Sequence, residues 1–258
     1  MAQTGALVVN ADDWGRDRDT TSRILDCAVR RTLSSVSAMV FMKDSERAAD
    51  IARERGIDAG LHLNFTSPFS APGISTRLSE HQQPVSLFLR RHRLAPVIFH
   101  PGLVRSFEYV VAAQREEYCR LYGAEPERID GHHHMHLCSN VVLAKLIPAG
   151  TVVRRSFSFQ PGEKSFANRM YRQLVDRQLA RRHRLTDFFF SLGPLDRPDR
   201  FQRFASLANK FTVEVMTHPV DPREYRFLAE GECLRWTGDV AIAPKYAVCR
   251  RPELSNAR

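Results

Sequence analysis

Aspartate and histidine residues recur in this chain where short runs of aliphatic and β-branched residues end. The five side chains are Asp12, Asp13, His62, His132 and His218. Three ligands of the Asp and His type with one open position are typical of a hydrolytic metal site. Such a metal lowers the pKa of a bound water and polarises a carbonyl, while a nearby carboxylate and imidazole transfer protons. The residue types therefore predict metal-assisted hydrolysis.

The histidines are clustered. Four of the ten fall between residues 132 and 136, namely His132, His133, His134 and His136. A chain that uses histidine only structurally has no need of such a cluster, so metal or proton chemistry is favoured there. One ion cannot bind all four imidazoles. We therefore expect at least two of the last three to orient other groups or to lie at the surface.

Each signal by itself has a simpler interpretation. An Asp pair after a strand is commonly a helix N-cap, and a single histidine such as His62 is commonly a core or loop residue. Together these residues fall on four predicted strand ends, and this coincidence favours a site. Neighbouring strand residues point to opposite faces, but a turn at the strand end would let one of the paired carboxylates bind metal and the other act as a base.

Two further carboxylates share strand faces with the histidines. Asp130 lies two residues before His132, and Glu214 lies four residues before His218. Because side chains alternate along a strand, each carboxylate points to the same side as its histidine. We expect Asp130 and Glu214 to orient an imidazole or a water.

Strand-like and helix-like segments alternate along the chain. The predicted strands are 6–10, 35–41, 57–63, 128–131, 151–154, 186–191 and 211–217, and the clearest helices are 20–32, 45–55 and 103–122. Ser45 is the expected cap of the second helix and Gly56 its end. This order predicts an α/β fold, a single (β/α) barrel-like domain over residues 1–258, as a distorted seven- or eight-stranded TIM-type barrel. An open Rossmann-like sheet is the alternative, but the first strand–helix turn lacks G-x-G-x-x-G.

Residues 64–85 differ from the rest in composition. Three prolines (Pro68, Pro72 and Pro84) and Gly73 stand among many Ser and Thr residues. They predict a long irregular loop, and such loops are commonly lids or binding loops.

The composition excludes several classes of protein. The chain has 258 residues, of which 43% are hydrophobic and 26% charged, so extensive disorder is not expected. No stretch approaches the roughly 20 apolar residues that span a bilayer. The first residues lack the basic start of a signal peptide, and the five cysteines form no C-x-x-C pair. A reduced, cytoplasmic protein is the simplest expectation.

The formal charge of +9 is largely local. Residues 154–184 contain nine basic residues against Glu163 and Asp176. Phe166, Met170 and Leu174 recur at helical spacing, which predicts a basic helical segment with an Arg-rich outer face. A solvated face is the simplest interpretation, and contact with an anionic lipid or an acidic glycan is the alternative. Arg154, at a predicted strand end, is a candidate for substrate contact.

Four sequence blocks agree in order and spacing with a known family. They are Asn10-Ala-Asp-Asp-Trp-Gly15, Gly60-Leu-His-Leu-Asn64, Ile129-Asp-Gly-His-His-His-Met-His136 and Met216-Thr-His-Pro219. In these blocks the chain resembles the YdjC-like carbohydrate deacetylases. The resemblance implies a (β/α) barrel, one divalent metal ion and hydrolysis of an N-acetyl group from an amino sugar, in a chito-oligosaccharide or a glycolipid.

The same resemblance implies roles for individual residues. The metal ligands would be Asp13, His62 and His132, the general base would be Asp12, and the acid that protonates the departing amine would be His218. Family members are generally described with Mg²⁺. An Asp-His-His set is chemically better suited to Zn²⁺ or a similar ion, so the metal stays open.

Some positions depart from the family pattern. Trp14 stands where Phe is common and is expected in the aromatic wall of the site. Gly131 replaces a frequent Ser, and Val220 replaces a common Gly beside His218. His134 and His136 are further candidates for supporting or contacting the substrate.

Two other functions are compatible with parts of the pattern. A phosphoesterase on the same barrel would use arginines to bind phosphate. A non-enzymatic protein that binds nucleic acid or an anionic membrane surface would account for the pI of 9.7. The chain lacks the aromatic interleaving of nucleic-acid binders, and charge alone does not account for the histidines. We therefore expect an enzyme that does not bind nucleic acid. A homodimer and peripheral contact with an anionic surface are left open.

Overall fold

The computed structural model describes residues 5–159, 162–195 and 198–246. Its centre is one parallel sheet with the strand order β5-β4-β3-β2-β1-β7-β6. The strands are β1 (Ala6–Trp14), β2 (Ser35–Ala38), β3 (Ala59–Leu63), β4 (Arg128–Gly131), β5 (Val152–Val153), β6 (Phe188–Ser191) and β7 (Thr212–Thr217). Every pairing is parallel, so the carboxyl ends of all these strands lie at one end of the sheet.

The sheet is curled so that its two edge strands approach each other. Val152 of β5 forms a parallel bridge with Arg184, just before β6, and the Ser158 amide donates to the Phe189 carbonyl at 2.8 Å. These contacts give a barrel-like sheet with seven strands in the described part of the chain. The barrel-like prediction is confirmed, and the open Rossmann-like alternative is wrong.

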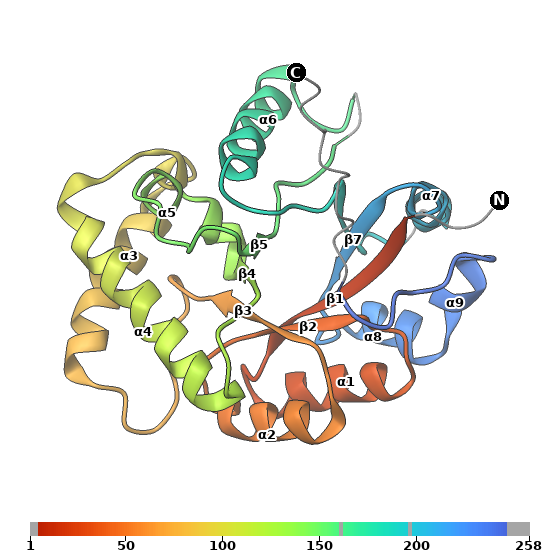
Figure 1. The fold of residues 1–258 in the computed structure, drawn as a ribbon, viewed down its shortest axis with the longest axis horizontal. Coiled ribbons are helices and arrows are strands. Elements are labelled where there is room, and N and C mark those ends of the chain that lie inside the picture. Colours follow the sequence, from red (N-terminus) through yellow and green to blue (C-terminus); the bar gives the residue numbers. More distant parts are fainter. Residues whose placement is uncertain (1–4, 160–161, 196–197, 247–258) are drawn as a thin grey trace, which may run out of the picture.

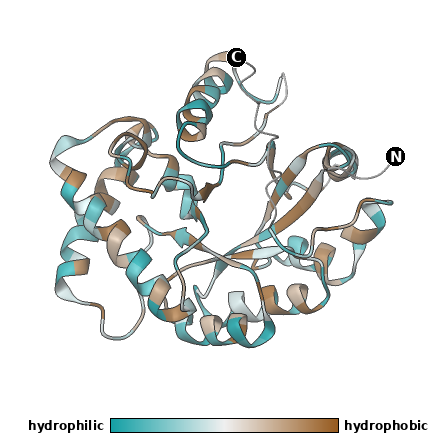
Figure 2. Cartoon of the chain, viewed as in Figure 1, coloured by the Kyte–Doolittle hydropathy of each residue, from teal (hydrophilic) through white to brown (hydrophobic). Residues whose placement is uncertain are grey.

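Helices surround the sheet (Figure 1). They are α1 (Arg18–Val29), α2 (Ser45–Arg55), α3 (Thr76–Arg91), α4 (Val104–Tyr122), α5 (Ser139–Leu143), α6 (Phe166–Ala180), α7 (Pro198–Ala208), α8 (Pro222–Ala229) and α9 (Glu232–Trp236), with short 3₁₀ turns η1 (Ala95–Val97), η2 (Pro101–Leu103) and η3 (His132–Leu137). Hydrophobic residues follow β1 and β7 through the middle of the molecule (Figure 2). In the described part of the chain, no helix is both long and apolar enough to span a bilayer.

The start of α2 differs from the prediction. Asp44, not Ser45, occupies the N-cap position. The Ser45 hydroxyl accepts from the Met42 amide and donates to the Met39 carbonyl, so it fixes the preceding turn instead. Gly56 ends α2 as predicted, with φ of 65°.

The irregular segment after β3 is shorter than predicted. It covers residues 64–75, because α3 begins at Thr76 and continues through Pro84. Ser75 caps α3 by accepting from the Leu78 amide, and Leu78, Val85 and Leu89 are buried along one face. That buried apolar face stabilises the helix despite the hydrogen bond that proline removes.

The basic segment 154–184 is not one helix, and the three apolar residues at helical spacing do not face inward. Only α6 is helical, and Phe166, Met170 and Leu174 are 69%, 48% and 56% exposed. The buried positions of α6 are instead Asp176 and Leu179. The Asp176 carboxylate accepts from the Ser156 amide at 2.8 Å and pairs with Arg155, which turns this side of the helix inward.

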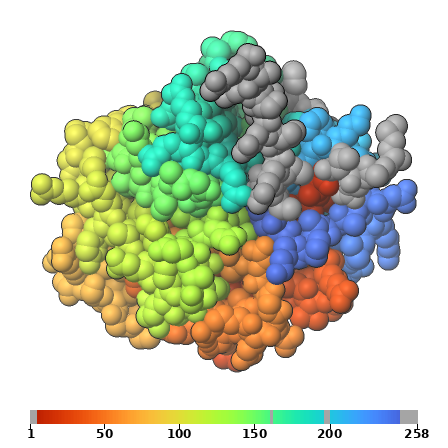
Figure 3. Space-filling view, viewed as in Figure 1, coloured from red at the N-terminus to blue at the C-terminus, as the bar shows by residue number. Residues whose placement is uncertain are grey.

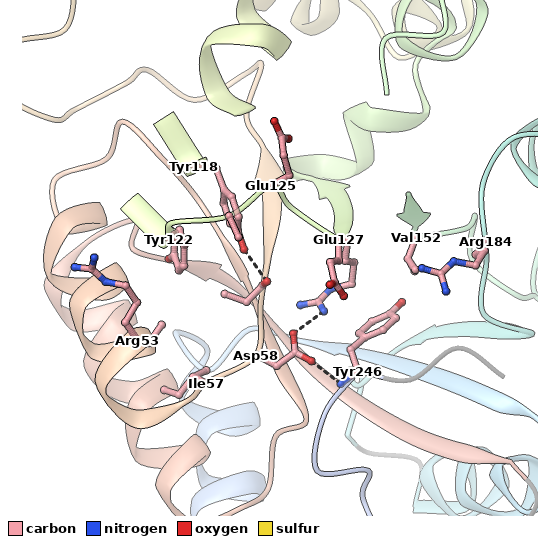
Figure 4. A pocket seen from close by; sticks show the side chains of 14 residues that line it. Arg53, Ile57, Asp58, Tyr118, Tyr122, Glu125, Glu127, Val152, Arg184 and Tyr246 are labelled. Carbon is pink, nitrogen blue, oxygen red and sulfur yellow. Dashed lines mark hydrogen bonds and ion pairs between the residues drawn. The ribbon is translucent and has the colours of Figure 1, made fainter. Parts of the chain in front are cut away.

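A cavity of about 380 Å³ lies where the strands begin, away from the histidine cluster (Figure 4). The Asp58 carboxylate connects two residues that line the cavity, because it accepts from Arg128 Nη1 at 3.1 Å and from the Tyr246 amide at 2.9 Å. The Arg128 guanidinium stacks on the Tyr246 ring at 4.3 Å. Tyr246 therefore packs against the residues at the amino ends of β3 and β4.

Candidate active site

The end of β1 turns two consecutive carboxylates toward one site. The pairing register of β1 with β2 shifts between Ala11 and Trp14, and Asp13 has a φ of 70°. A left-handed residue in a strand bulge changes the direction of its side chain. Asp12 and Asp13 are both buried, and each contacts a different part of the site.

Three ligand-type side chains converge at the carboxyl end of the sheet. Asp13 Oδ1 lies 2.9 Å from His132 Nδ1 and 3.5 Å from His62 Nε2. The ligand atoms of these three residues lie within 4.8 Å of one another, and all three residues are buried. One carboxylate oxygen and two imidazole nitrogens are a suitable set for a divalent transition metal. The residues present therefore fit the metal that the sequence predicted.

A second group with metal-ligand spacing consists of Asp12, His62 and Asp130. Both of its carboxylates are already bound to Arg154, at 2.7 Å each. That guanidinium is shared by both carboxylates and repels a cation. Asp13 also pairs with an arginine, since Arg16 Nη1 lies 2.6 Å from its Oδ2, but its Oδ1 stays directed toward the two imidazoles. The group with Asp13 is therefore the candidate metal centre.

His62 is oriented from behind by Asp130. Its Nδ1–H donates to Asp130 Oδ1 at 2.7 Å, and the Ser37 hydroxyl donates to Asp130 Oδ2 at 2.6 Å. Burial lowers the pKa of His62, but the Asp130 and Asp12 carboxylates outweigh burial and raise it to about 10. Burial raises the pKa of Asp13, but hydrogen bonds from His132 and His62 hold it well below its usual range.

Arg154 is fully buried among three carboxylates. Its Nη1 and Nη2 lie 2.7 and 2.8 Å from the two oxygens of Asp12. Nη2 also lies 2.7 Å from Asp130, and Nε lies 2.7 Å from Glu214. Burial opposes the charge of Arg154, but Asp12, Asp130 and Glu214 raise its pKa well above the usual value. Arg154 thus connects Asp12 to Asp130, the carboxylate that orients His62.

His136 fixes the backbone of Arg154. Its Nε2–H donates to the Arg154 carbonyl at 2.9 Å, and burial lowers the pKa of His136 to about 4. Gly131 makes room for this ring, since a Cβ at position 131 would lie 3.0 Å from the His136 amide nitrogen. Gly131, which stands where the family pattern commonly has Ser, therefore allows His136 to pack closely against β4.

Glu214 contacts Arg154, not His218. Its second oxygen accepts from the Tyr246 hydroxyl at 2.7 Å, and burial raises its pKa against the effect of Arg154. Tyr246 lies outside every predicted strand and every motif, so no sequence signal pointed to it. Asn10 was not predicted as a site residue either, although it opens the Asn-Ala-Asp-Asp block and its side chain donates to Asp12 Oδ1 at 2.9 Å.

His218 lies on the open side of the site. Its side chain is 36% exposed, and its Nε2 lies 4.0 Å from Asp12 Oδ2. The His218 amide donates to Glu224 Oε2 at 2.6 Å, which holds the turn after β7. Among these groups His218 is the one that a solvent-borne substrate reaches most readily.

The other two clustered histidines are not part of the ligand group, although the ring centroid of His133 lies 4.0 Å from that of His132. His133 and His134 both have left-handed backbone, with φ of 53° and 59°. His133 is exposed, with its Nδ1 2.9 Å from the Thr66 hydroxyl of the irregular segment. The His134 ring packs edge-on against Phe157, and burial lowers its pKa well below the ordinary value.

Trp14 is not part of an aromatic wall, and that prediction is wrong. Its side chain is completely buried, and its indole N–H donates to the Ala48 carbonyl of α2 at 3.2 Å. The turn at Asp13 directs the next residue toward the helix layer, so Trp14 fills the core.

Comparison with known proteins agrees with this geometry. A family model described as YdjC-like protein matches residues 6–242. A carbohydrate deacetylase of Mus musculus is 28% identical over 84% of this chain and 78% of its own length. A carbohydrate deacetylase of Geobacillus stearothermophilus is 28% identical over 82% of this chain and 78% of its own length.

The fold also matches a solved structure. A protein from Enterococcus faecalis V583 that has been assigned to cellobiose-phosphate cleavage superposes with a TM-score of 0.64. The match covers 95% of this chain and 97% of that protein, at 18% sequence identity. At this identity the likeness supports the fold alone.

Proposed function

The chain belongs to the family of YdjC-like proteins, and on that basis we propose that it is a metal-dependent carbohydrate deacetylase that hydrolyses the N-acetyl group of an amino sugar. The observation that carries the proposal is the position of Asp12. It lies beside the group formed by Asp13, His62 and His132, and His218 is 4.0 Å away on the open side. A potential base, an acid and a metal-ligand set thus surround one small space.

Asp13, His62 and His132 would hold the metal. When bound, a divalent cation lowers the pKa of a water and polarises the amide carbonyl. His62 is held in place by Asp130, so its Nε2 stays directed toward Asp13. The ion itself is left open between Mg²⁺ and a nitrogen-preferring ion such as Zn²⁺.

Asp12 would accept a proton from the attacking water. The two nitrogens of Arg154 and the amide of Asn10 fix the orientation of its carboxylate. Water oxygen adds to the carbonyl carbon, the C–N bond breaks, and His218 would protonate the departing nitrogen. The products are acetate and a free amine.

The substrate would be an N-acetylated amino sugar, either a free oligosaccharide or a glycolipid. Relatives described as carbohydrate deacetylases support a sugar, and a Serratia marcescens chitooligosaccharide deacetylase is 28% identical over 51% of this chain. A cytoplasmic location remains part of the proposal, supported by the unpaired Cys27, Cys119, Cys138 and Cys233.

The phosphoesterase alternative has less support. Three arginines near the site are already paired with carboxylates. Arg154 is saturated by Asp12, Asp130 and Glu214, Arg155 pairs with Asp176, and Arg16 binds Asp13 and Asp17. A phosphate would have to compete with these carboxylates for a guanidinium.

Acetate release from N,N′-diacetylchitobiose tests the proposal. The chain is stripped of metal with a chelator and then assayed with Mg²⁺, Mn²⁺ or Zn²⁺, with the Asp12→Asn variant as the matched control. We expect acetate and a free amine in equal amounts from the wild type and at least 100-fold less from the variant. If acetate release by the two proteins were equal under every metal condition, the proposed chemistry would be wrong.

A further inference from the structure

Helix α6 carries an apolar face that the described chain leaves uncovered. Phe166, Met170, Tyr171 and Leu174 are 69%, 48%, 41% and 56% exposed. In Figures 1 and 3 the helix stands at the upper rim of the molecule, away from the middle of the sheet. We propose that this face docks the protein on an anionic lipid membrane. The proposal goes beyond the proposed function and does not depend on it.

The exposure is not a sign of a loosely attached helix. The opposite side of α6 is fixed by the Asp176 carboxylate, which binds the Ser156 amide and Arg155. Leu179 is buried, and the Arg172 guanidinium lies 5.0 Å from the Phe159 ring centroid. The helix is therefore docked by one face and presents the other.

Basic residues continue the apolar face. Residues 166, 170, 174, 177 and 181 are three or four positions apart, so they lie along one side of the helix. Arg177 and Arg181 are exposed, and among the described residues neither has a carboxylate partner. Apolar side chains beside arginines are the arrangement by which an interfacial helix binds anionic lipid.

A second segment, residues 85–105, also combines exposed apolar residues with arginines. Leu87, Leu94, Ile98 and Phe99 are exposed, and residues 85–105 include four arginines and no acidic residue. The four arginines are Arg90, Arg91, Arg93 and Arg105.

Both segments pack against α5. The Asn140 side chain of α5 bonds the backbone of His100, and Val141 and Val142 line a small pocket with Gln178 and Leu179 of α6. We therefore include residues 87–99 in the membrane-docking surface.

A second copy of the chain fits this surface less well. A two-fold contact places the same patch against itself, so Arg177 and Arg181 would face the like charges of the partner. Nucleic acid also fits less well. Its binding relies mainly on polar and basic contacts to phosphate, to which Met170 and Leu174 contribute nothing. A lipid surface accepts both the apolar and the basic side chains.

Flotation with vesicles tests the proposal. The full chain is mixed with vesicles of neutral phosphatidylcholine alone or with 30% phosphatidylglycerol, at about 0.05 and 0.5 M NaCl. We expect flotation with the anionic vesicles only, reduced at the higher salt because screening weakens the arginine contacts.

Variants separate the two contributions. Arg177→Gln with Arg181→Gln should weaken binding by about 25-fold, which is roughly fivefold for each basic residue. Phe166→Ser with Met170→Ser should weaken it by tenfold or more. Leu234→Ser with Arg235→Gln, on exposed positions of α9, is the matched control and should bind as the wild type does.

Several outcomes would overturn the proposal. One is the absence of flotation, and another is equal flotation of the wild type and the two α6 variants. A third is a stable dimer in light scattering that the Phe166→Ser and Met170→Ser variant abolishes. Capture of RNA in competition with vesicles, lost in the same variant, would assign the surface to nucleic acid instead. The Asp12→Asn variant should float as the wild type does, so failure of the proposed deacetylase activity and failure of docking are distinguishable.

Discussion

Arg154 binds Asp12 with two parallel contacts, Nη1 to Oδ2 at 2.7 Å and Nη2 to Oδ1 at 2.8 Å. The two residues are 142 positions apart in the chain, and both are buried. A fork-to-fork pair fixes the plane of the carboxylate as well as its charge. The orientation of the proposed base therefore depends mainly on the arginine that follows β5, with one further hydrogen bond from the Asn10 side chain.

Replacing Arg154 should impair both stability and activity. Arg154→Met leaves Asp12, Asp130 and Glu214 buried without the guanidinium that they share, and we expect a loss of about 3–5 kcal/mol in the free energy of unfolding. Arg154→Lys keeps a charge but cannot form the double contact, so it should fold and have a kcat at least tenfold lower. Urea denaturation and acetate release measure the two effects. Arg155→Lys is the matched control, and an equal kcat loss in that variant would contradict the special role of Arg154.

Asp12 and Asp13 should separate metal binding from proton transfer. Asp13→Asn removes a charged ligand and should lose metal and activity together, as should His132→Ala. Asp12→Asn should retain the metal content of the wild type and lose turnover, because an amide cannot accept the proton. Metal content by mass spectrometry and acetate release are compared for the same protein preparations. A fully active Asp12→Asn protein would exclude Asp12 as the base.

Metal removal should lower stability as well as activity. A ligand that binds only the folded state stabilises it by about 2.7 kcal/mol at 100 times its Kd. Two imidazole ligands favour Zn²⁺ or Mn²⁺ over Mg²⁺ at equal concentration. Thermal unfolding with each ion after chelation should therefore show the smallest rise in Tm with Mg²⁺. A shift that persists in Asp13→Asn with His132→Ala would place the stabilising ion elsewhere.

His136 should make the fold sensitive to acid. Its ordinary pKa is about 6.5, and burial lowers the folded value to about 4. The folded state therefore binds fewer protons than the unfolded state between these values, so stability falls as the pH falls through this window. From pH 7 to pH 5 we expect His136 to account for about 2 kcal/mol of lost stability.

The test compares wild type with His136→Gln, in which the amide can still donate to the Arg154 carbonyl. Urea denaturation at pH 7 and pH 5 should show a smaller pH-dependent loss in the variant. His92→Gln, an exposed position after α3, is the control and should follow the wild type. Parallel curves for all three proteins would show that His136 is not the acid-sensitive group.

Tyr246 should act on the site from the opposite end of the barrel. Tyr246→Phe removes the hydroxyl that donates to Glu214, and leaving this buried carboxylate oxygen unpaired should cost about 1–3 kcal/mol. We also expect a lower kcat with little change in KM, because Glu214 positions Arg154 and makes no contact with substrate in the proposed site. Tyr225→Phe, whose hydroxyl donates to Asp26 near the surface, should change neither quantity by much. Equal effects of the two substitutions would indicate a general loss of packing.

Local sequence patterns determined the strands and the candidate ligands. The runs 186–191 and 211–217 form strands at nearly the predicted positions, because buried parallel strands need apolar and β-branched residues. Asp13, His62 and His132 then had to approach one another, since parallel strands bring their carboxyl ends to the same rim. The sequence also predicted a turn at the end of this strand, which would let Asp12 and Asp13 take different roles.

Only the tertiary structure decided which side chains became partners. Arg154 and Tyr246 reach Asp12 and Glu214 because the curled sheet brings distant strands together around one interior, and residue spacing carries no measure of that curl. The direction of α6 was decided in the same way. Its periodicity defines an apolar stripe, but the ion pair of Asp176 with Arg155 determines which side of the helix faces the protein. The spacing of residues along the chain determines which side chains lie on the same face of a helix or strand. The contacts of the folded chain determine whether that face packs against the protein or is exposed to solvent.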